Sequence, residues 1–405
     1  MSNYGWINTV VGDCLVPLSV VGKTKIQTRD YRPSGRFPVI DQGQTKIAGW
    51  TDDENAVIDS ELPLIVFGDH TRALKYVDFP FARGADGTQL LKPKPGIDPL
   101  FFYYACRAID LPGRGYNRHF SILKQKGISY PDNAKEQNQI GNVLRAIEKA
   151  VDLESDAVTV TSNVKKAAML QLFARGLRGE AQKETEIGPM PVSWSPQTIL
   201  QLCEIWSGGT PRKSIAEYWN GDIPWVSGKD LKSPALDDAI DHVSAAGVEA
   251  ASRLAPKGAV LLLVRGMGLA KDLPVAVINR PMAFNQDIKA LVSRGGYSGQ
   301  FLRSAIYVGK ERLLSQIVPS AHGTMTLNLN DVETFKIACP SDPGEATEIA
   351  SLLDALDRKI KLHQQKRTVL EGLFTSLLHK LMIGELRAAD LDLSAIRQGE
   401  ESVAA

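Results

Sequence analysis

Two long stretches of this chain, residues 139–180 and 348–385, share one pattern of apolar and polar positions. In each stretch, four apolar residues recur at spacings of four, three and four. These residues are Ile140, Leu144, Ile147 and Val151 in the first stretch, and Ile349, Leu353, Leu356 and Ile360 in the second. Such spacing predicts a helix with a single apolar seam. Both stretches also close alike, on Gly179-Glu180 and Gly384-Glu385, so the sequence indicates an internal duplication.

Each seam needs a partner. A helix of about 40 residues spans roughly 60 Å, and the partner that costs least association entropy is the other copy within the same chain. We therefore expect an intramolecular antiparallel coiled coil. Two alternatives stay open, in which each helix packs on its own domain or pairs with another subunit. Glu154 and His363 interrupt the seam and residues 163–168 are weakly apolar, which predicts a splayed or covered middle.

The regions before the two helices contain short apolar or aromatic runs separated by Gly, Pro and Asp, a pattern typical of short strands. The runs are Phe37–Ile40, Leu62–Phe67 and Tyr76–Phe81, then Ala259–Val264, Val275–Ile278 and Ile288–Val292, with a helical patch at Pro99–Ala108. The predicted fold class is α+β, with two irregular mixed α/β domains separated by two long helices in a pseudo-two-fold repeat. The expected segments are a first domain at 1–135, a helix block at 136–185, a second domain at 186–340, a helix block at 341–387 and a frayed tail at 388–405.

The junctions between domains and helices repeat as well. Each domain ends in a strand-like run and a proline, Pro131 or Pro340, followed by an acidic residue at the first helical turn, Glu136 or Glu345. A proline that ends a strand and a carboxylate near a helix N-terminus form a favourable helix entry. The duplication therefore includes the entry into each helix.

Composition and charge narrow the class of protein. The formal net charge is +1 and 23% of the residues are charged, far from the strong basic excess of an autonomous nucleic-acid-binding domain. If the chain grips DNA, it does so through local clusters or with the help of a partner. No run of eighteen apolar residues and no secretory leader pattern is present, so we expect no membrane partner and a cytoplasmic location.

Motifs for catalysis or metal binding are missing from the sequence. The cysteines, Cys14, Cys106, Cys203 and Cys339, have no CxxC spacing and are expected to be buried thiols. A phosphate-binding loop fails because Pro17 stands where glycine is needed, and no GxSxG elbow, HExxH helix or Asn/Asp-Pro-Pro-aromatic segment occurs. Asp287-Ile288-Lys289 lacks the acidic partner of a nuclease site, so we interpret it as solvated charges beside a strand. We therefore expect a non-catalytic chain with no metal site.

Several local segments resemble those of one family. They are Gly35–Ile40 with Gln42-Gly43, Val66–Arg72 and Arg114–His119 in the first half, and Ser207–Pro211, Tyr218–Val226 and Asn285-Gln286 in the second. Together with the repeated helices, they resemble the specificity subunit of type I restriction-modification systems over nearly the whole chain. The most specific part runs from Gly-Gly-Thr-Pro to Ile-Pro-Trp. Because the first half lacks Gly-Gly-Thr-Pro, we expect its domain to differ in sub-family and target.

The resemblance implies a function. Each domain would be a target-recognition domain that reads one half of a bipartite site in double-stranded DNA, and the helix pair would set the gap between the half-sites. The two domains, related by a pseudo-two-fold and held apart by a rigid spacer, would meet major-groove faces about one turn of the DNA helix, roughly 34 Å, apart. Two modification (methyltransferase) subunits would dock on the helices and restriction (endonuclease/translocase) subunits would join them. The chain itself would need no cofactor, because S-adenosylmethionine, ATP and Mg would be bound in the partner subunits. A coiled-coil protein scaffold and a DNA-binding enzyme with an unfamiliar site are the alternatives.

Candidate DNA contacts are polar residues beside glycine or aromatic neighbours. The cations suited to phosphates or a guanine edge are Arg72, Lys75, Arg114, Arg118, Lys213, Lys229 and Arg265. Asn285 and Gln286 could make a bidentate contact to adenine. For each of these residues the alternative is a solvated or internally paired side chain. Trp219 and Trp225 are more typical of a core than of base stacking, and Gly208-Gly209 of a turn than of a phosphate cradle.

Overall fold

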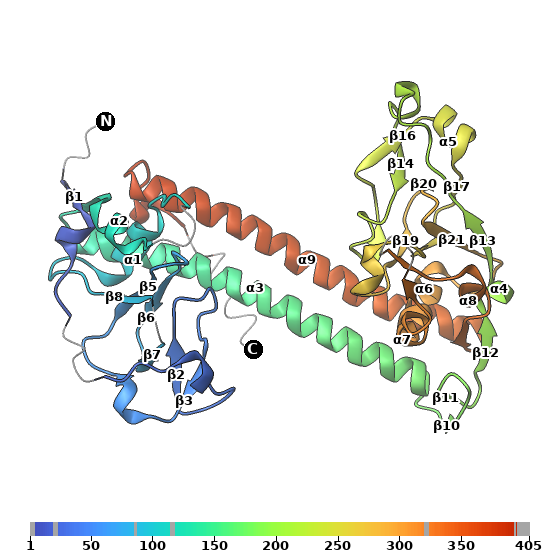
Figure 1. The fold of residues 1–405 in the computed structure, drawn as a ribbon, viewed down its shortest axis with the longest axis horizontal. Coiled ribbons are helices and arrows are strands. Elements are labelled where there is room, and N and C mark those ends of the chain that lie inside the picture. Colours follow the sequence, from blue (N-terminus) through green and yellow to red (C-terminus); the bar gives the residue numbers. More distant parts are fainter. Residues whose placement is uncertain are drawn as a thin grey trace. The chain divides into compact units, whose positions relative to one another are not determined.

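The chain forms two compact units, which we describe separately. The computed structural model describes residues 5–18, 23–84, 87–113, 118–319, 324–392 and 394 (Figure 1). Unit 1 comprises Met1–Asp156 and Gln364–Ala405, and unit 2 comprises Ala157–His363. The two predicted long helices are present as α3, Ala134–Arg175, and α9, Pro343–Met382, and each runs from one unit into the other.

The described part of unit 1 contains three small sheets. Its strands are β1 Trp6–Val10, β2 Phe37–Ile40, β3 Gly49–Thr51, β4 Val57–Ile58, β5 Leu64–Gly68, β6 Leu74–Val77, β7 Phe81–Arg83, β8 Thr88–Leu91 and β9 Gly127–Pro131. Its helices are α1 Pro99–Arg107 and α2 Phe120–Gln125, with 3-10 turns η1 Val11–Cys14, η2 Thr28–Asp30, η3 Glu54–Ala56 and η6 Ala388–Asp390. One sheet has the order β3-β2-β7-β4, with β2 and β7 parallel, and a second has the order β6-β5-β8. In the third, strand β1 pairs antiparallel with β9, which leads into α3.

Unit 2 repeats this plan with additions. Its strands are β10 Gln182–Lys183, β11 Met190–Pro191, β12 Ser195–Thr198, β13 Cys203–Ser207, β14 Ile223–Val226, β15 Ala235–Leu236, β16 Asp241–Val243, β17 Leu254–Ala255, β18 Val260–Leu263, β19 Val275–Ile278, β20 Met282–Phe284, β21 Ile288–Ser293, β22 Val318–Pro319, β23 Met325–Thr326 and β24 Lys336–Cys339. Its helices are α4 Ile199–Leu202, α5 Ala245–Ala251, α6 Gly299–Val308, α7 Lys310–Leu314 and α8 Leu329–Glu333, with 3-10 turns η4 Ala216–Tyr218 and η5 Met267–Ala270. The two larger sheets have the orders β16-β14-β20-β17 and β13-β21-β18-β19-β15, and β10-β11, β12-β24 and β22-β23 form two-stranded sheets.

The four-stranded sheets of the two units have the same topology and register. In unit 1, β2 pairs parallel with β7 through Val39 and Ala82, and β4 pairs antiparallel with the same Ala82 through Val57. In unit 2, β14 pairs parallel with β20 through Trp225 and Ala283, and β17 pairs antiparallel with that alanine. The pairing of β1 with β9 is likewise repeated by β12 with β24, the strand that precedes α9. The duplication predicted from the helices therefore extends through both domains.

Helices α3 and α9 pack together within each unit, antiparallel as predicted. In unit 1 the start of α3 shares a buried core with the end of α9, including Leu144 and Leu377. In unit 2 the end of α3 shares a core with the start of α9, including Phe173 and Leu353. Of the eight seam residues, Ile140, Leu144, Ile147, Ile349 and Leu353 are buried, whereas Val151, Leu356 and Ile360 are half-buried. The seam also packs on its own domain, because α1 approaches α3 so closely that a Cβ on Gly141 would lie 3.1 Å from the Phe101 amide nitrogen.

The two long helices end in the same motif. Gly179 and Gly384 have φ angles of +63° and +69°, a conformation that glycine adopts without steric cost. The next amide, of Glu180 or Glu385, donates to the carbonyl five residues earlier, at 2.8 and 2.9 Å. This is the bond of a Schellman cap, which satisfies a carbonyl left free at the helix end. The predicted likeness of the two helix ends is thus confirmed, although α3 itself stops earlier, at Arg175.

Two expectations were wrong in detail. The run Tyr76–Phe81 is not one strand, because Asp78, Phe79 and Pro80 separate β6 from β7, which belong to different sheets. Pro80 has no amide hydrogen to donate to a sheet, which favours a break between strands at this position. The start of the tail expected to fray forms η6, and Ala388 is buried in the core of unit 1.

Helices α1 and α6 occupy corresponding places before the last strands of their units. Asp98 caps α1 by accepting from the amides of Leu100 and Phe101, both at 2.9 Å, and Pro99 favours the first helical position. Ser298 caps α6 in the same way through the Phe301 amide at 3.3 Å. Both helices bury most of their length, so the polar side chains that they carry are held close to the cores.

Candidate nucleic-acid interface

The Gly-Gly-Thr-Pro opening of unit 2 follows β13 and packs tightly against neighbouring backbone. A Cβ on Gly208 would lie 2.2 Å from the carbonyl oxygen of Phe284, and one on Gly209 would lie 1.9 Å from that of Ala251. Only glycine permits such approaches. Glycine is therefore needed at positions 208 and 209 because this loop passes close to the backbone at the ends of β20 and α5.

This opening loop is tied to the connection between β20 and β21. The Thr210 hydroxyl donates to Gln286 Oε1 at 2.6 Å, and Lys289 Nζ donates to Ser207 Oγ at 2.6 Å. Gln286 is exposed, whereas its neighbour Asn285 is only 8% exposed. Residues far apart in the sequence therefore form one polar surface at the end of β13.

Arg265 and Asn285 both contact Asp287 at this surface. Arg265 Nε donates to Asp287 Oδ1 at 2.6 Å, and Asn285 Nδ2 donates to the other carboxylate oxygen at 3.3 Å. The backbone amide of Asn285 also donates to the Val226 carbonyl at 3.0 Å. Asn285 is thus committed to internal bonds, while half of the Arg265 side chain, 51%, stays exposed. The spacing of the two candidates along the chain did not predict that they share a carboxylate.

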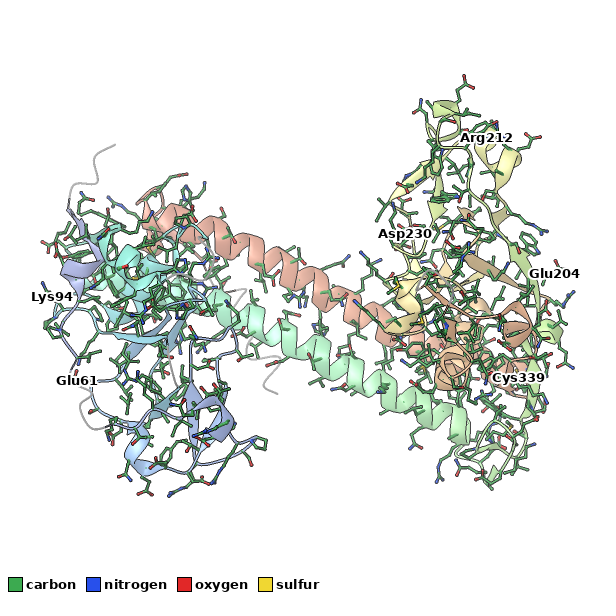
Figure 2. The ribbon with its side chains drawn as sticks, viewed as in Figure 1. Glu61, Lys94, Glu204, Arg212, Asp230 and Cys339 are labelled. Carbon is green, nitrogen blue, oxygen red and sulfur yellow. The ribbon has the colours of Figure 1, made fainter. Side chains whose placement is uncertain are left out.

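Lys213 and Lys229 lie on exposed loops of unit 2. Lys229 pairs with Asp241 at 2.8 Å, whereas Lys213 makes no ion pair with any of the residues that the structure describes. Arg212, the residue before Lys213, is labelled in Figure 2, and its carbonyl accepts from Trp219 Nε1 at 3.3 Å. Trp225 is buried and donates to the Gly209 carbonyl at 3.0 Å, which agrees with a core position.

The candidates of unit 1 divide into exposed and buried residues. Arg72 lies in the turn between β5 and β6, has a φ of +63° and donates to the Leu111 carbonyl at 2.6 Å. Lys75 is 6% exposed and its Nζ donates to the Asp41 carbonyl at 2.8 Å, and burial lowers its pKa. Its place on β6 turns it inward, which the sequence pattern did not indicate. Arg118 is exposed, and Arg114 lies outside the described residues.

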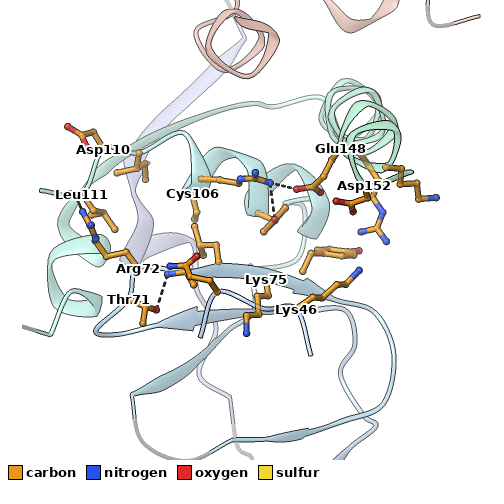
Figure 3. Close-up of a pocket in the computed structure, with 18 residues that line it drawn as sticks. Lys46, Thr71, Arg72, Lys75, Cys106, Asp110, Leu111, Glu148 and Asp152 are labelled. Carbon is orange, nitrogen blue, oxygen red and sulfur yellow. Dashed lines mark hydrogen bonds and ion pairs between the residues drawn. The ribbon is translucent and has the colours of Figure 1, made fainter. Parts of the chain in front are cut away.

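A cavity of about 740 Å³ opens beside Arg72 in unit 1 (Figure 3). Its basic lining residues are Lys46, Arg72, Lys75, Arg107, Arg145 and Lys149, and its acidic ones are Asp110, Glu148 and Asp152. Several of these cations are already paired, Arg107 with Glu148 and Arg145 with Asp78. Sequence reasoning missed Lys46, Arg145 and Lys149, because they come from separate elements that only the fold brings together. Lys46 and Lys149 are exposed and extend the basic surface that carries Arg72.

The described residues offer no metal cluster and no reactive thiol. Among them, no group of three or more His, Cys, Asp or Glu side chains is placed to hold a metal ion. The four cysteines are free and buried, as expected, and burial raises the pKa of Cys203 and of Cys339 to about 12. Such thiols stay protonated near neutral pH and are poor nucleophiles. In the same part of the chain, no helix is long and apolar enough to cross a membrane.

Comparison with known proteins agrees with this geometry. The family model of the type I restriction modification DNA specificity domain matches residues 191–372. The EcoR124I/EcoR124II specificity subunit of Escherichia coli is 26% identical over 346 residues, which cover 83% of this chain and 83% of that protein. The MjaIX specificity subunit of Methanocaldococcus jannaschii is 30% identical over 214 residues, which cover 51% of this chain and 48% of that protein.

A solved structure shares the fold. The crystal structure of the type I restriction-modification S subunit from M. genitalium superposes with a TM-score of 0.66 and 16% sequence identity, covering 94% of this chain and 97% of that chain. The agreement includes both mixed domains and the long helices, which are the parts that the internal repeat duplicates. This chain is therefore similar to the specificity subunits of type I restriction-modification systems over most of its length, and residues 191–372 match the DNA specificity domain of that family.

Proposed function

We propose that residues 1–135 and 186–340 are target-recognition domains, each of which reads one half of a bipartite site in double-stranded DNA. The observation that carries the proposal is the repetition of one sheet topology and register in both domains, each with basic side chains on exposed loops. A duplicated recognition domain matches a DNA target that has two half-sites. The helix blocks at 136–185 and 341–387 act as the spacer that sets the gap.

The nine candidate residues take different parts in this proposal. Exposed cations contact phosphates or a guanine edge, and Gln286 contacts a base. The exposed cations are Arg72, Arg118, Lys213, Lys229 and Arg265, and Arg114 is proposed from its sequence alone. Lys229 and Arg265 can exchange their partly exposed carboxylate partners for DNA, because exposed surface ion pairs contribute little to stability. Lys75 and Asn285 are buried, so they support the loops that touch DNA.

Catalysis belongs to partners in this proposal. Two modification subunits dock on the paired helices and restriction subunits join them, and S-adenosylmethionine, ATP and Mg bind in those subunits. The net charge of +1 supports this division, because a nearly neutral chain gains little general attraction to DNA and needs a partner to hold it tightly. The complex acts in the cytoplasm.

Methylation mapping tests the proposal. The chain is co-expressed with its modification subunit, and methylated adenines are mapped across the host DNA. We expect one split motif with two half-sites and a fixed gap. A stable complex that methylates no defined motif would refute DNA recognition and favour the protein scaffold.

A further inference from the structure

Unit 2 contains a charged cavity that DNA recognition does not use. It measures about 580 Å³ and lies where the second half of α3, the first half of α9 and α6 meet. Lys165 of α3, Arg303 of α6 and Asp357 of α9 line it together. Their side chains are 13%, 9% and 22% exposed, so two cations and one carboxylate are largely removed from water.

The charges in this cavity do not balance. Lys165 pairs with one oxygen of Asp357, and Arg303 Nη2 donates to the other at 3.4 Å. Asp354, one helical turn earlier, pairs with the exposed Arg358 at 3.1 Å. Its carboxylate also interacts electrostatically with Lys165 and Arg303 without bonding to either. One carboxylate thus serves two buried cations. An uncompensated buried charge costs several kcal/mol, so the site favours a further anion.

The other charges around the cavity do not supply that anion. Its remaining acidic lining residue, Asp272, bonds to Lys310 at 2.6 Å and to the Tyr307 hydroxyl at 3.2 Å. Lys166 and Lys232 also line the cavity, are exposed and make no ion pair within the described part of the chain. They add positive charge at the entrance.

At the corresponding position of unit 1, one carboxylate pairs with one cation. Glu148 has the repeat position of Asp357, and it accepts from the Tyr104 hydroxyl at 2.8 Å and pairs with Arg107. Phe374 of α9 lies 4.7 Å from the Arg107 guanidinium, so α9 brings an aromatic ring and no second cation there.

The arginine and tyrosine of the two capped helices have also exchanged places. Counted from the capping residues Asp98 and Ser298, Tyr103 corresponds to Arg303 and Arg107 to Tyr307. The fold therefore tolerates one cation at this position, and the second cation in unit 2 is a property of that unit alone.

We propose that the cavity of unit 2 binds an oxyanion, the phosphate or carboxylate group of a small ligand, between Lys165 and Arg303. A guanidinium presents several donors in a plane that matches two oxygens of such a group, and a lysine ammonium adds a point charge. Among the described residues, Arg303 bonds only through Nη2, to Asp357 and at 3.5 Å to Ser304 Oγ, so donors remain for a ligand. This site is independent of the proposed DNA recognition.

Thermal unfolding of the full-length chain tests this proposal. Inorganic phosphate and, separately, acetate are titrated against chloride at constant ionic strength. A ligand that binds only the folded protein raises Tm with increasing concentration. We expect such a rise for wild type with phosphate or acetate, and the more effective probe identifies the class of oxyanion. Equal Tm values in all three salts would overturn the proposal.

Two variants and a control locate the response. Lys165→Met removes the surplus charge, so we expect the oxyanion response to vanish while Tm in chloride is unchanged or higher. Lys149→Met removes an exposed lysine that lines the cavity of unit 1, and it should keep the full response. Arg303→Lys keeps the charge but loses the planar fork, so we expect the Kd for the oxyanion to rise about tenfold. A response that persists unchanged in both variants at Lys165 and Arg303 contradicts the site.

Discussion

The two units have the same sheet topology although their side chains differ. Equivalent backbone hydrogen bonds explain why the chain follows the same path in both. In unit 1 the Ile26 amide donates to the Arg83 carbonyl at 3.0 Å. In unit 2 the Gly209 amide donates to the Phe284 carbonyl at 2.9 Å. Arg83 and Phe284 each follow the alanine that pairs with both neighbouring strands, so the two bonds are equivalent. The chain thus takes the same path with and without Gly-Gly-Thr-Pro, which leaves the loop side chains free to differ between the domains.

The half-buried acidic position that Glu148 and Asp357 share in the repeat separates the units further. Asp357 holds two cations that are largely buried, whereas Glu148 holds Arg107, of which 37% is exposed. Removing the Asp357 carboxylate leaves two largely buried cations without their partner. Removing the Glu148 carboxylate leaves one cation, Arg107, which water can reach. The carboxylate at this position should therefore contribute more to the stability of unit 2 than to that of unit 1.

Paired variants at this position should give the largest effect. Asp357→Asn should destabilise unit 2 by about 3–5 kcal/mol in buffer without phosphate or acetate, because it leaves two buried cations unpaired. Glu148→Gln should cost less, about 1–2 kcal/mol, since it mainly removes charge-assisted hydrogen bonds. Urea unfolding with a spectroscopic probe in each unit would measure both. Equal losses in the free energy of unfolding would contradict the difference in charge balance between Asp357 and Glu148.

Gly209→Ala should have the next largest effect. The added methyl group would meet the Ala251 carbonyl at 1.9 Å, a backbone atom that cannot turn aside. Forcing extra atoms into a packed place costs about 1–3 kcal/mol, and the opening loop of unit 2 should shift. We expect weaker recognition of one half-site only, measured by methylation of substrates altered in either half-site.

Gly228→Ala is the matched control in the neighbouring loop. Its methyl group would lie 3.2 Å from the end of the Leu263 side chain, which can move. Its stability and half-site selectivity should stay close to wild type. Loss of both half-sites in Gly209→Ala would argue against separate readers.

Gln286→Ala should give the smallest effect on stability but a clear one on recognition. Gln286 is exposed, so unfolding should change by less than about 0.5 kcal/mol. Losing one base contact should reduce discrimination at a single position of one half-site by about 1–3 kcal/mol. Asn285→Ala, one residue earlier, removes a buried support of Asp287 and should lower stability as well. Fluorescence anisotropy with the complete complex would compare the two, and unchanged base preference in Gln286→Ala would remove it from the contact surface.

The long helices and their ends were predictable because their signals are local. Spacings of three and four and a glycine-acid pair lie close together in the sequence, and the structure keeps the caps at Gly179 and Gly384. Strand runs were found less precisely, since the split at Pro80 depends on which sheet each half joins. Local signals therefore identified the elements and the pairing of the two repeated helices, whereas the partners of the strands came only from the fold.

The site could be predicted less well, for a physical reason. Lys75 was an attractive contact because it lies near a glycine loop, yet its strand turns it toward Asp41. Arg265 and Asn285 share Asp287 only because β18 and β21 pair side by side. Likewise, the two cations around Asp357 come from α3 and α6, and no spacing in one segment reveals that they meet.

The order in which the chain is synthesised differs from the order in which its units can be completed. Unit 2 is one continuous segment, Ala157–His363, so every residue of its core is available once that segment has left the ribosome. Unit 1 begins first but needs Phe374, Leu377 and Leu381 from the end of α9 to close its core. Until then the apolar seam at Ile140 and Leu144 lacks these partners, and a nascent chain with exposed apolar surface is prone to aggregate. The half that is made first is therefore completed last, and chaperones would meet this protein with its N-terminal unit unfinished.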